Sequence, residues 1–296
     1  TKDTSYISST IIDGNQAGSV VSFMSNEDSN TSLVGLTLTN GYSNYGGAIR
    51  LDYSSPNLTN LIIQGNTALI SGGGIMGQFS DINITNTLIL NNSAQTNGGG
   101  IYLEGSSPYL SRSIVHNNDG PSAVFIEKSD ATFTNTTIVD NAGTGLRCIN
   151  ETNQVLLNVI VSSNVTEEVE LQSSFPISNL FIENSLIKGG ISAIINQGGA
   201  NQISFGTSSL SMDPYLSSQF TLSSYSPCIG AGADSVQIDG TWYYAPATDI
   251  DGNLRPNPAG SNPDIGAYEH ERSTPLPPEP PTNLAVEEGN TSLTLN

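Results

Sequence analysis

The stretch ITNTLILNN, residues 84–92, has four close copies in the chain. These copies are LTNLIIQGN (58–66), LSRSIVHNN (110–118), FTNTTIVDN (133–141) and LLNVIVSSN (156–164). Their closing asparagines follow one another at intervals of 26, 26, 23 and 23 residues. A second motif keeps the same period and reads GGAIRL at 46–51, GGGIMG at 72–77 and GGGIYL at 98–103. Self-similarity at a fixed period of this length indicates a repeat architecture.

Each repeat holds short alternating apolar runs separated by Gly, Asn, Ser and Pro, and none shows helical periodicity. Short strands within one coil per repeat are typical of a parallel β-helix, whose coils stack at the strand spacing of about 4.8 Å. We therefore expect an all-β solenoid of roughly eight or nine coils, from about residue 6 to residue 210.

Five asparagines close the repeats and share one position in them: Asn66, Asn92, Asn118, Asn141 and Asn164. Asn and Gly tolerate the left-handed backbone conformation that a tight corner requires. An Asn side chain can also form a hydrogen bond to its copy in the next coil. The series therefore predicts a structural ladder and not a ligand site.

The chain has 296 residues, of which 27 are acidic and 8 basic, so its formal net charge is −19. Nucleic acids and anionic lipid surfaces bind clustered Lys and Arg, and this charge argues against both as partners. No apolar run reaches about 18 residues, so membrane insertion is not expected. The two cysteines, Cys148 and Cys228, lie in apolar contexts and are expected to be buried and unpaired.

The Gly-rich motifs and FTNTTIVDN resemble the right-handed parallel β-helix repeats of the pectin-lyase-like superfamily and of bacterial surface proteins. The C-terminal part resembles the tail of secreted β-helix proteins with a choice-of-anchor label, in DPYL (213–216), FTLSSYSPCIGAG (220–232), DIDGNLRP (249–256) and PDIGAYE (263–269). The resemblance implies a right-handed solenoid with a C-terminal cap, secreted or at the cell surface. The resemblance does not identify a function, because proteins with this fold have several different functions.

Four segments are expected: solenoid coils at 1–211, a capping segment at 212–271, a Pro-rich linker at 272–281 and a truncated module at 282–296. The last segment resembles the opening strands of a fibronectin type III module. We therefore expect a monomer within a larger multidomain chain. The capping segment is expected to cover part of an apolar outward column made of Ile62, Leu88, Ile114, Thr137 and Ile160.

Alternation along the Gly-led strands places a second set of side chains outward. One column comprises Arg50, Met76, Tyr102, Phe125, Arg147 and Glu170, and the next comprises Asp52, Gln78, Glu104 and Glu127. Adjacent, uncovered aromatic rings at Tyr102 and Phe125 beside polar groups suit a glycan, whose C–H groups stack on rings. The alternative interpretation is an ordinary solvated face with side-chain ladders.

Glu104 and Glu127 occupy one position on successive coils, so their carboxylates can approach to about 5 Å. Such a pair can share a proton, bind calcium or act as a retaining glycosidase pair, or the two side chains simply splay apart. A lyase would add an Arg or Lys base, for which Arg147 is the candidate nearest to carboxylates.

DIDGN, residues 249–253, resembles the start of a calcium loop through Asp249, Asp251 and Asn253. The glutamate that closes such a loop is missing, because Gly260 stands in its place. The alternative is a structural turn in the cap, with an internal ion pair between Arg255 and Asp264.

The predicted function is that of a non-catalytic, secreted or cell-surface module that binds polysaccharide along the face from Arg50 to Glu170 or serves adhesion, without a cofactor other than calcium. The first alternative is a polysaccharide lyase or glycoside hydrolase with Glu104, Glu127 and Arg147 as its working groups. The second is a rigid spacer that displays other domains.

Overall fold

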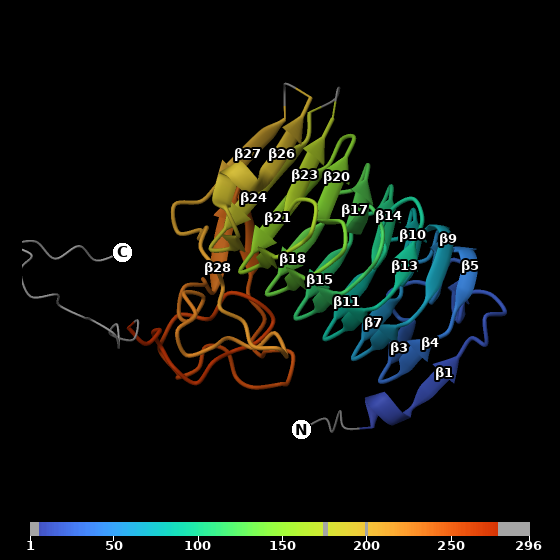
Figure 1. Cartoon of the computed structure of the whole chain (residues 1–296), viewed down its shortest axis with the longest axis horizontal. Helices are drawn as coiled ribbons and strands as arrows, with labels where there is room; N and C mark the ends of the chain where they lie inside the picture. The colour runs from blue at the N-terminus through green and yellow to red at the C-terminus, as the bar shows by residue number, and fades with distance from the viewer. Residues whose placement is uncertain (1–5, 174–176, 199–200, 278–296) are drawn as a thin grey trace, which may run out of the picture.

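The computed structural model describes residues 6–173, 177–198 and 201–277, and Figure 1 shows these residues as a parallel β-solenoid with a C-terminal cap. The proposed fibronectin-like start at 282–296, and part of the linker, lie outside the described residues. Among these described residues, helical structure is confined to two 3₁₀ turns, η1 (Ile7–Ser9) and η2 (Gly190–Ala193). Within the described segments, no helix has the length and apolar character needed to cross a membrane.

Three parallel sheets of eight strands run the length of the solenoid. Sheet A contains β1 (Ile11–Asp13), β4 (Thr37–Thr39), β8 (Ile62–Gln64), β12 (Leu88–Leu90), β16 (Ile114–His116), β19 (Thr137–Val139), β22 (Ile160–Ser162) and β25 (Leu186–Ile187). Sheet B contains β2 (Val21–Phe23), β6 (Ile49–Asp52), β10 (Ile75–Gln78), β14 (Ile101–Glu104), β17 (Ser122–Glu127), β20 (Thr144–Ile149), β23 (Val169–Gln172) and β26 (Ile194–Gln197). Sheet C contains β3 (Ser32–Val34), β7 (Asn57–Thr59), β11 (Asn83–Thr85), β15 (Tyr109–Ser111), β18 (Thr132–Thr134), β21 (Asn153–Leu157), β24 (Asn179–Glu183) and β27 (Gln202–Phe205).

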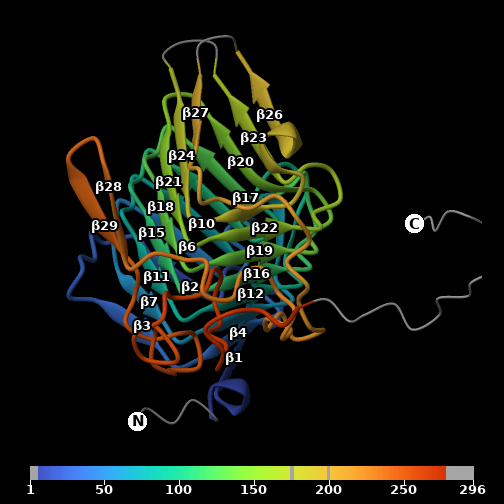
Figure 2. The same cartoon turned by 90° about the vertical axis from the view of Figure 1, so that its left-hand side faces the viewer.

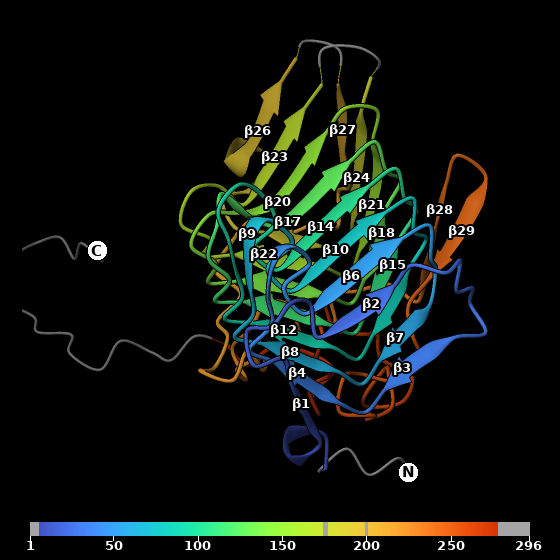
Figure 3. The ribbon, with the colours of Figure 1, turned by 90° about the vertical axis from the view of Figure 1, so that its right-hand side faces the viewer.

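The chain visits sheets B, C and A in turn, and each turn makes one coil, so the prediction of an all-β solenoid with about eight coils is confirmed. A short fourth sheet is formed by β5 (Tyr42–Tyr45), β9 (Thr67–Ser71) and β13 (Ser93–Ala94). Figure 3 shows the N-terminal end of the solenoid, where β1, β2 and β3 are the terminal strands of their sheets.

Inward side chains of all three sheets form one continuous core, which includes Ile49, Ile75, Ile101, Val124 and Leu146 from sheet B. Each of these residues stacks on its copy in the next coil through the parallel register. Cys148 belongs to this core and Cys228 to the core under the cap, and both are unpaired and buried, as predicted.

The predicted asparagine ladder is confirmed. The side-chain Nδ2 of each member donates to the Oδ1 of the next, at 2.9 Å from Asn66 to Asn92, 3.1 Å to Asn118, 3.1 Å to Asn141 and 2.9 Å to Asn164. The series ends at Glu168, whose carboxylate accepts from Asn164 Nδ2 at 2.7 Å. Main-chain N–H groups of the ladder also donate to the next Oδ1, so these buried amides are satisfied from coil to coil.

A second ladder, made of hydroxyl groups, was not predicted. The corner between sheets B and C holds the buried residues Ser54, Ser80, Ser106 and Ser129. The main-chain N–H of each of the first three donates to the hydroxyl of the next serine, at 2.9–3.1 Å. The residue before each serine has a positive φ, namely Tyr53, Phe79, Gly105 and Lys128. Every corner of this type thus pairs a left-handed residue with a buried polar one.

The cap, residues 212–271, lies along sheet A, where Figure 2 shows its orange and red loops. Leu222, Cys228 and Ile265 of the cap form a second apolar core with Ile160 and Leu186 of sheet A. Three further hydrogen bonds fix the contact: Ala267 N to Thr137 Oγ1 (3.1 Å), Asn158 Nδ2 to the Ala233 carbonyl (2.8 Å) and Asn135 Nδ2 to the Asp264 carbonyl (3.1 Å). The cap therefore covers part of the apolar column, as expected.

Replacing Asn118 with alanine is expected to lower the free energy of unfolding by about 2–4 kcal/mol, because buried partners on the two neighbouring coils lose their hydrogen bonds. Urea denaturation followed by circular dichroism measures this loss. The control is Asn153→Ala, an exposed asparagine of sheet C, with an expected change below about 0.5 kcal/mol. Equal losses in the two variants would show that the ladder adds nothing beyond surface contacts.

Candidate ligand-binding face

The outward face of sheet B carries the two predicted columns in the predicted register. Arg50, Met76, Tyr102, Phe125, Arg147 and Glu170 are consecutive pairing partners from β6 to β23. Asp52, Gln78, Glu104 and Glu127 are consecutive in the neighbouring column, after which Ile149 interrupts the polar series. The structure therefore brings all ten predicted ligand-binding residues onto one face of six successive coils.

A hydrogen-bonded cluster around Tyr102 lies at the centre of this face. The Tyr102 hydroxyl is 3.3 Å from Oε2 of both Glu104 and Glu127. Gln78 Nε2 donates to Glu104 Oε2 at 2.8 Å, and Asn150 Nδ2 donates to Glu127 Oε1 at 3.3 Å. Burial, and then the two negative charges, raise the pKa of Tyr102, so its hydroxyl stays protonated and acts as a donor. The two glutamates are thus held together and do not splay apart.

The prediction of uncovered rings at Tyr102 and Phe125 is wrong for Phe125, which is only 1% exposed. Its ring is stacked between Tyr102, with centroids 5.3 Å apart, and the Arg147 guanidinium, 5.7 Å from the centroid. Met76, on the preceding coil, is only 4% exposed. Coil spacing brings large neighbours of one column into van der Waals contact, so the ring faces that a sugar would need are already occupied.

Arg147 contacts three other side chains of the face. Its Nε forms an ion pair with Glu170 Oε2 at 3.0 Å, and Nη2 donates to Gln172 Oε1 at 3.2 Å. Its guanidinium plane also lies over the Phe125 ring. These contacts leave Arg147 as a link between three coils, which is a poor arrangement for a base that must reach a substrate proton.

Exposed aromatic side chains do occur at the edge of this face, but at positions that the sequence analysis missed. Tyr53 and Phe79 are 60% and 50% exposed, and their rings stack with centroids 4.9 Å apart and planes 23° apart. They directly follow Asp52 and Gln78, at the corner between sheets B and C. Beneath the Phe79 ring lies Gly105, where an added Cβ would stand only 2.7 Å from ring carbons.

A sequence signal for this pair exists. Both residues have φ of about +49°, a conformation that is uncommon for bulky side chains and costs roughly 1–2 kcal/mol. Elsewhere along the same corner the repeat uses Gly105, Lys128 and Asn150. Aromatic residues in two consecutive copies of a corner that favours Gly or Asn are therefore an anomaly that the repeat alignment alone reveals.

The DIDGN segment of the cap forms a turn that the side chain of Asp249 organises. The main-chain N–H groups of Asp251 and Asn253 donate to Asp249 Oδ1 at 3.0 and 2.8 Å, while Asn253 Nδ2 and Glu269 N donate to Oδ2. Four donors occupy the acceptor positions of this carboxylate, which supports the structural-turn interpretation over a calcium loop. Nor do three or more His, Cys, Asp or Glu side chains converge as a metal site anywhere in the part of the chain that the structure describes.

The prediction of an ion pair between Arg255 and Asp264 is wrong, because the ion-pair partner of Arg255 is Glu269. Arg255 Nη1 lies 2.9 Å from Glu269 Oε2 and donates to the main-chain carbonyl of Asp264 at 2.7 Å. The Asp264 carboxylate instead accepts from the N–H groups of Gly230 and His270. Burial, and then the charge of Glu269, raise the pKa of Asp264 to about 7.

This raised pKa predicts a pH effect on the stability of the cap. The folded protein keeps a proton on Asp264 that the unfolded chain releases near its ordinary pKa of 3.8, so this stabilising contribution is fully present below pH 3.8 and disappears as the pH rises through about 7. Thermal unfolding between pH 5 and 8 should show a steeper loss of stability in the wild type than in Asp264→Asn. Asp239→Asn, an exposed control, should follow the wild type. Parallel profiles for wild type and Asp264→Asn would contradict the prediction.

Comparison with curated proteins and with solved structures gives no match. A protein-family model described as "Right handed beta helix region" matches residues 47–210, which is more than half of the chain. The matched region begins at the Gly-rich motif before β6 and ends at Leu210, which forms a β-bridge with Leu186 of β25. It therefore includes the Tyr53–Phe79 pair and the Tyr102 cluster. The chain belongs to the right-handed β-helix family.

Proposed function

We propose that this chain is a non-catalytic, secreted or cell-surface β-helix module of a bacterial protein, which binds a polysaccharide at the edge of sheet B and so serves in adhesion. The position outside the cell rests on the resemblance of the C-terminal motifs to secreted β-helix proteins. The net charge of −19 favours a neutral polymer over a uronic one, because like charges repel.

The observation that carries this proposal is the exposed, stacked pair of Tyr53 and Phe79. Contiguous exposed apolar patches often mark interaction sites, and the faces and edges of aromatic rings suit the C–H groups of sugars. Asp52 and Gln78 precede the two rings and are half-buried, so they place a carboxylate and an amide beside them for sugar hydroxyl groups.

Catalysis is less well supported than binding. A lyase needs a free base, and Arg147 is committed to Glu170, Gln172 and Phe125. A hydrolase needs two carboxyl groups with separate tasks, whereas Glu104 and Glu127 share one phenolic donor and carry amide donors as well. Because the carboxylates of Glu104 and Glu127 lie close together, a glycoside hydrolase is still the second candidate function. A rigid spacer is the third.

Binding is tested by affinity electrophoresis against neutral and uronic polysaccharides, with and without calcium. We expect Tyr53→Ala and Phe79→Ala to weaken binding at least about tenfold, because each loses a ring that contacts the sugar. The matched control is Tyr215→Ala, since Tyr215 is also a tyrosine with positive φ and is 55% exposed, but it lies in the cap. Retention of a neutral polysaccharide by both corner variants would overturn the proposal, and no retention of any polymer by the wild type would favour the spacer.

The second candidate is tested by the release of reducing ends and of unsaturated uronate from the same polymers. We expect no turnover by the wild type, because the polar groups of the face are engaged with one another. Turnover that disappears in Glu104→Gln or Glu127→Gln would establish an enzyme on this face. Circular dichroism of the two variants distinguishes such a loss from misfolding.

A further inference from the structure

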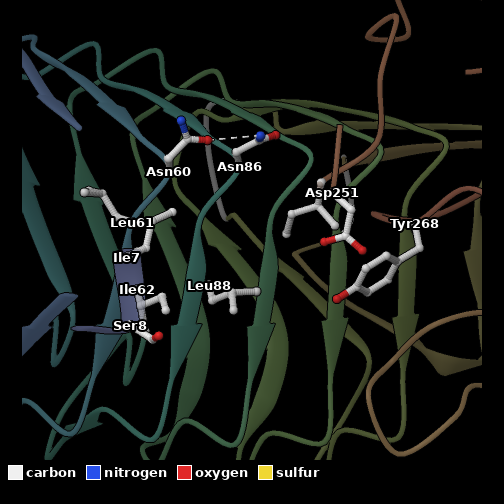
Figure 4. Close-up of a pocket in the computed structure, with 10 residues that line it drawn as sticks. Ile7, Ser8, Asn60, Leu61, Ile62, Asn86, Leu88, Asp251 and Tyr268 are labelled. Atoms are coloured by element: carbon white, nitrogen blue, oxygen red, sulfur yellow. Dashed lines mark hydrogen bonds between the residues drawn. The ribbon is translucent and has the colours of Figure 1, made fainter. Parts of the chain in front are cut away.

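The cap and the N-terminal turn leave a cleft over the middle of sheet A. At one end of the apolar column, Thr37 Oγ1 donates to the Ile7 carbonyl of η1 at 2.7 Å. At the other end, the cap covers Ile160. Between them, the half-buried side chains of Ile62 and Leu88 form the floor of a cleft of about 220 Å³ (Figure 4).

Polar groups without a partner line this cleft. Asp251 and Tyr268 reach it from the cap, as Figure 4 shows, and neither the carboxylate nor the hydroxyl forms a hydrogen bond or ion pair within the described residues. On the solenoid side, Asn86 Nδ2 donates to Asn60 Oδ1 at 3.1 Å, but the buried Asn86 Oδ1 accepts no hydrogen bond. That oxygen is closed off from solvent, so the polar groups that a ligand in the cleft can reach are those of Asp251 and Tyr268.

Asp251 differs from the other carboxylates around it. Asp249, Asp264 and Glu269 each accept hydrogen bonds from main-chain N–H groups or pair with Arg255. Asp251 is exposed at the mouth of the cleft and accepts none, and none of the residues that line the cleft is basic. The groups open to a ligand are thus one carboxylate and one hydroxyl, set beside an apolar floor.

We propose that this cleft binds a small hydroxylated ammonium compound, of which a free amino sugar is the simplest example. Its ammonium group pairs with Asp251, and its C–H face lies on Ile62 and Leu88. Tyr268 donates to an oxygen of the ligand. The site lies on sheet A, whereas the proposed polysaccharide site lies at the edge of sheet B, so neither proposal depends on the other.

The test uses glucosamine and glucose, which have the same ring and differ in charge. In ¹⁵N–¹H NMR titrations we expect glucosamine to bind with millimolar affinity and glucose at least about tenfold more weakly, because glucose lacks the charge-assisted hydrogen bond. The amide signals of Leu88, Asp251 and Tyr268 should shift together. Binding that is equal for both sugars, no detectable binding of glucosamine, or shifts that leave these amides unchanged would overturn the proposal.

Two variants locate the charge. Asp251→Asn should weaken glucosamine at least about tenfold, to the level of glucose, and leave the folding unchanged because the side chain has no partner in the described structure. Asp239→Asn removes the same charge from an exposed position outside the cleft and should change the affinity less than twofold. Wild-type affinity in Asp251→Asn, or an equal loss in both variants, would contradict a specific ion pair. Tyr268→Phe tests the hydroxyl and should weaken glucosamine about threefold.

Discussion

Each coil of this solenoid must present to the next coil the same hydrogen-bonding groups that it received from the previous one. The strands meet this requirement through the parallel ladders, but the corners have no strand partners. There the buried side chains of Asn92, Asn118 and Ser80 complete the pattern, because each is bound by its own copy. An apolar residue at such a position would leave main-chain groups unsatisfied on two coils.

The same constraint explains which side chains on the outer faces are free. Within a column, copies stand one strand spacing apart, so large residues in consecutive coils cover one another, as Tyr102, Phe125 and Arg147 do. Exposed groups arise where a column is interrupted or ends. Tyr53 and Phe79 precede Gly105 at one corner, and Ile62 and Leu88 lie where the cap no longer covers sheet A.

The period, the strand register, the asparagine ladder and the covering of sheet A were predictable, because repeat spacing and alternation depend on neighbours in sequence and on the next coil. The burial of Phe125 was not, since it depends on how Tyr102 and Arg147 pack around its ring. The pairing of Arg255 with Glu269 was not predictable either, because the cap has no repeat from which to infer its contacts. The exposed pair of Tyr53 and Phe79 was not predicted, because strand alternation assigns only strand residues to faces and these two residues lie at a corner.

The asparagine ladder has a direction. Every side-chain amide accepts through Oδ1 from the preceding coil and donates through Nδ2 to the following one, from Asn66 to Asn164. The amide dipoles are therefore aligned and add along the axis, much as peptide dipoles do in an α-helix, with their positive end toward the C-terminal coils. Glu168 lies at that end and receives the last N–H, so its carboxylate compensates an electrostatic field that the five asparagines create together.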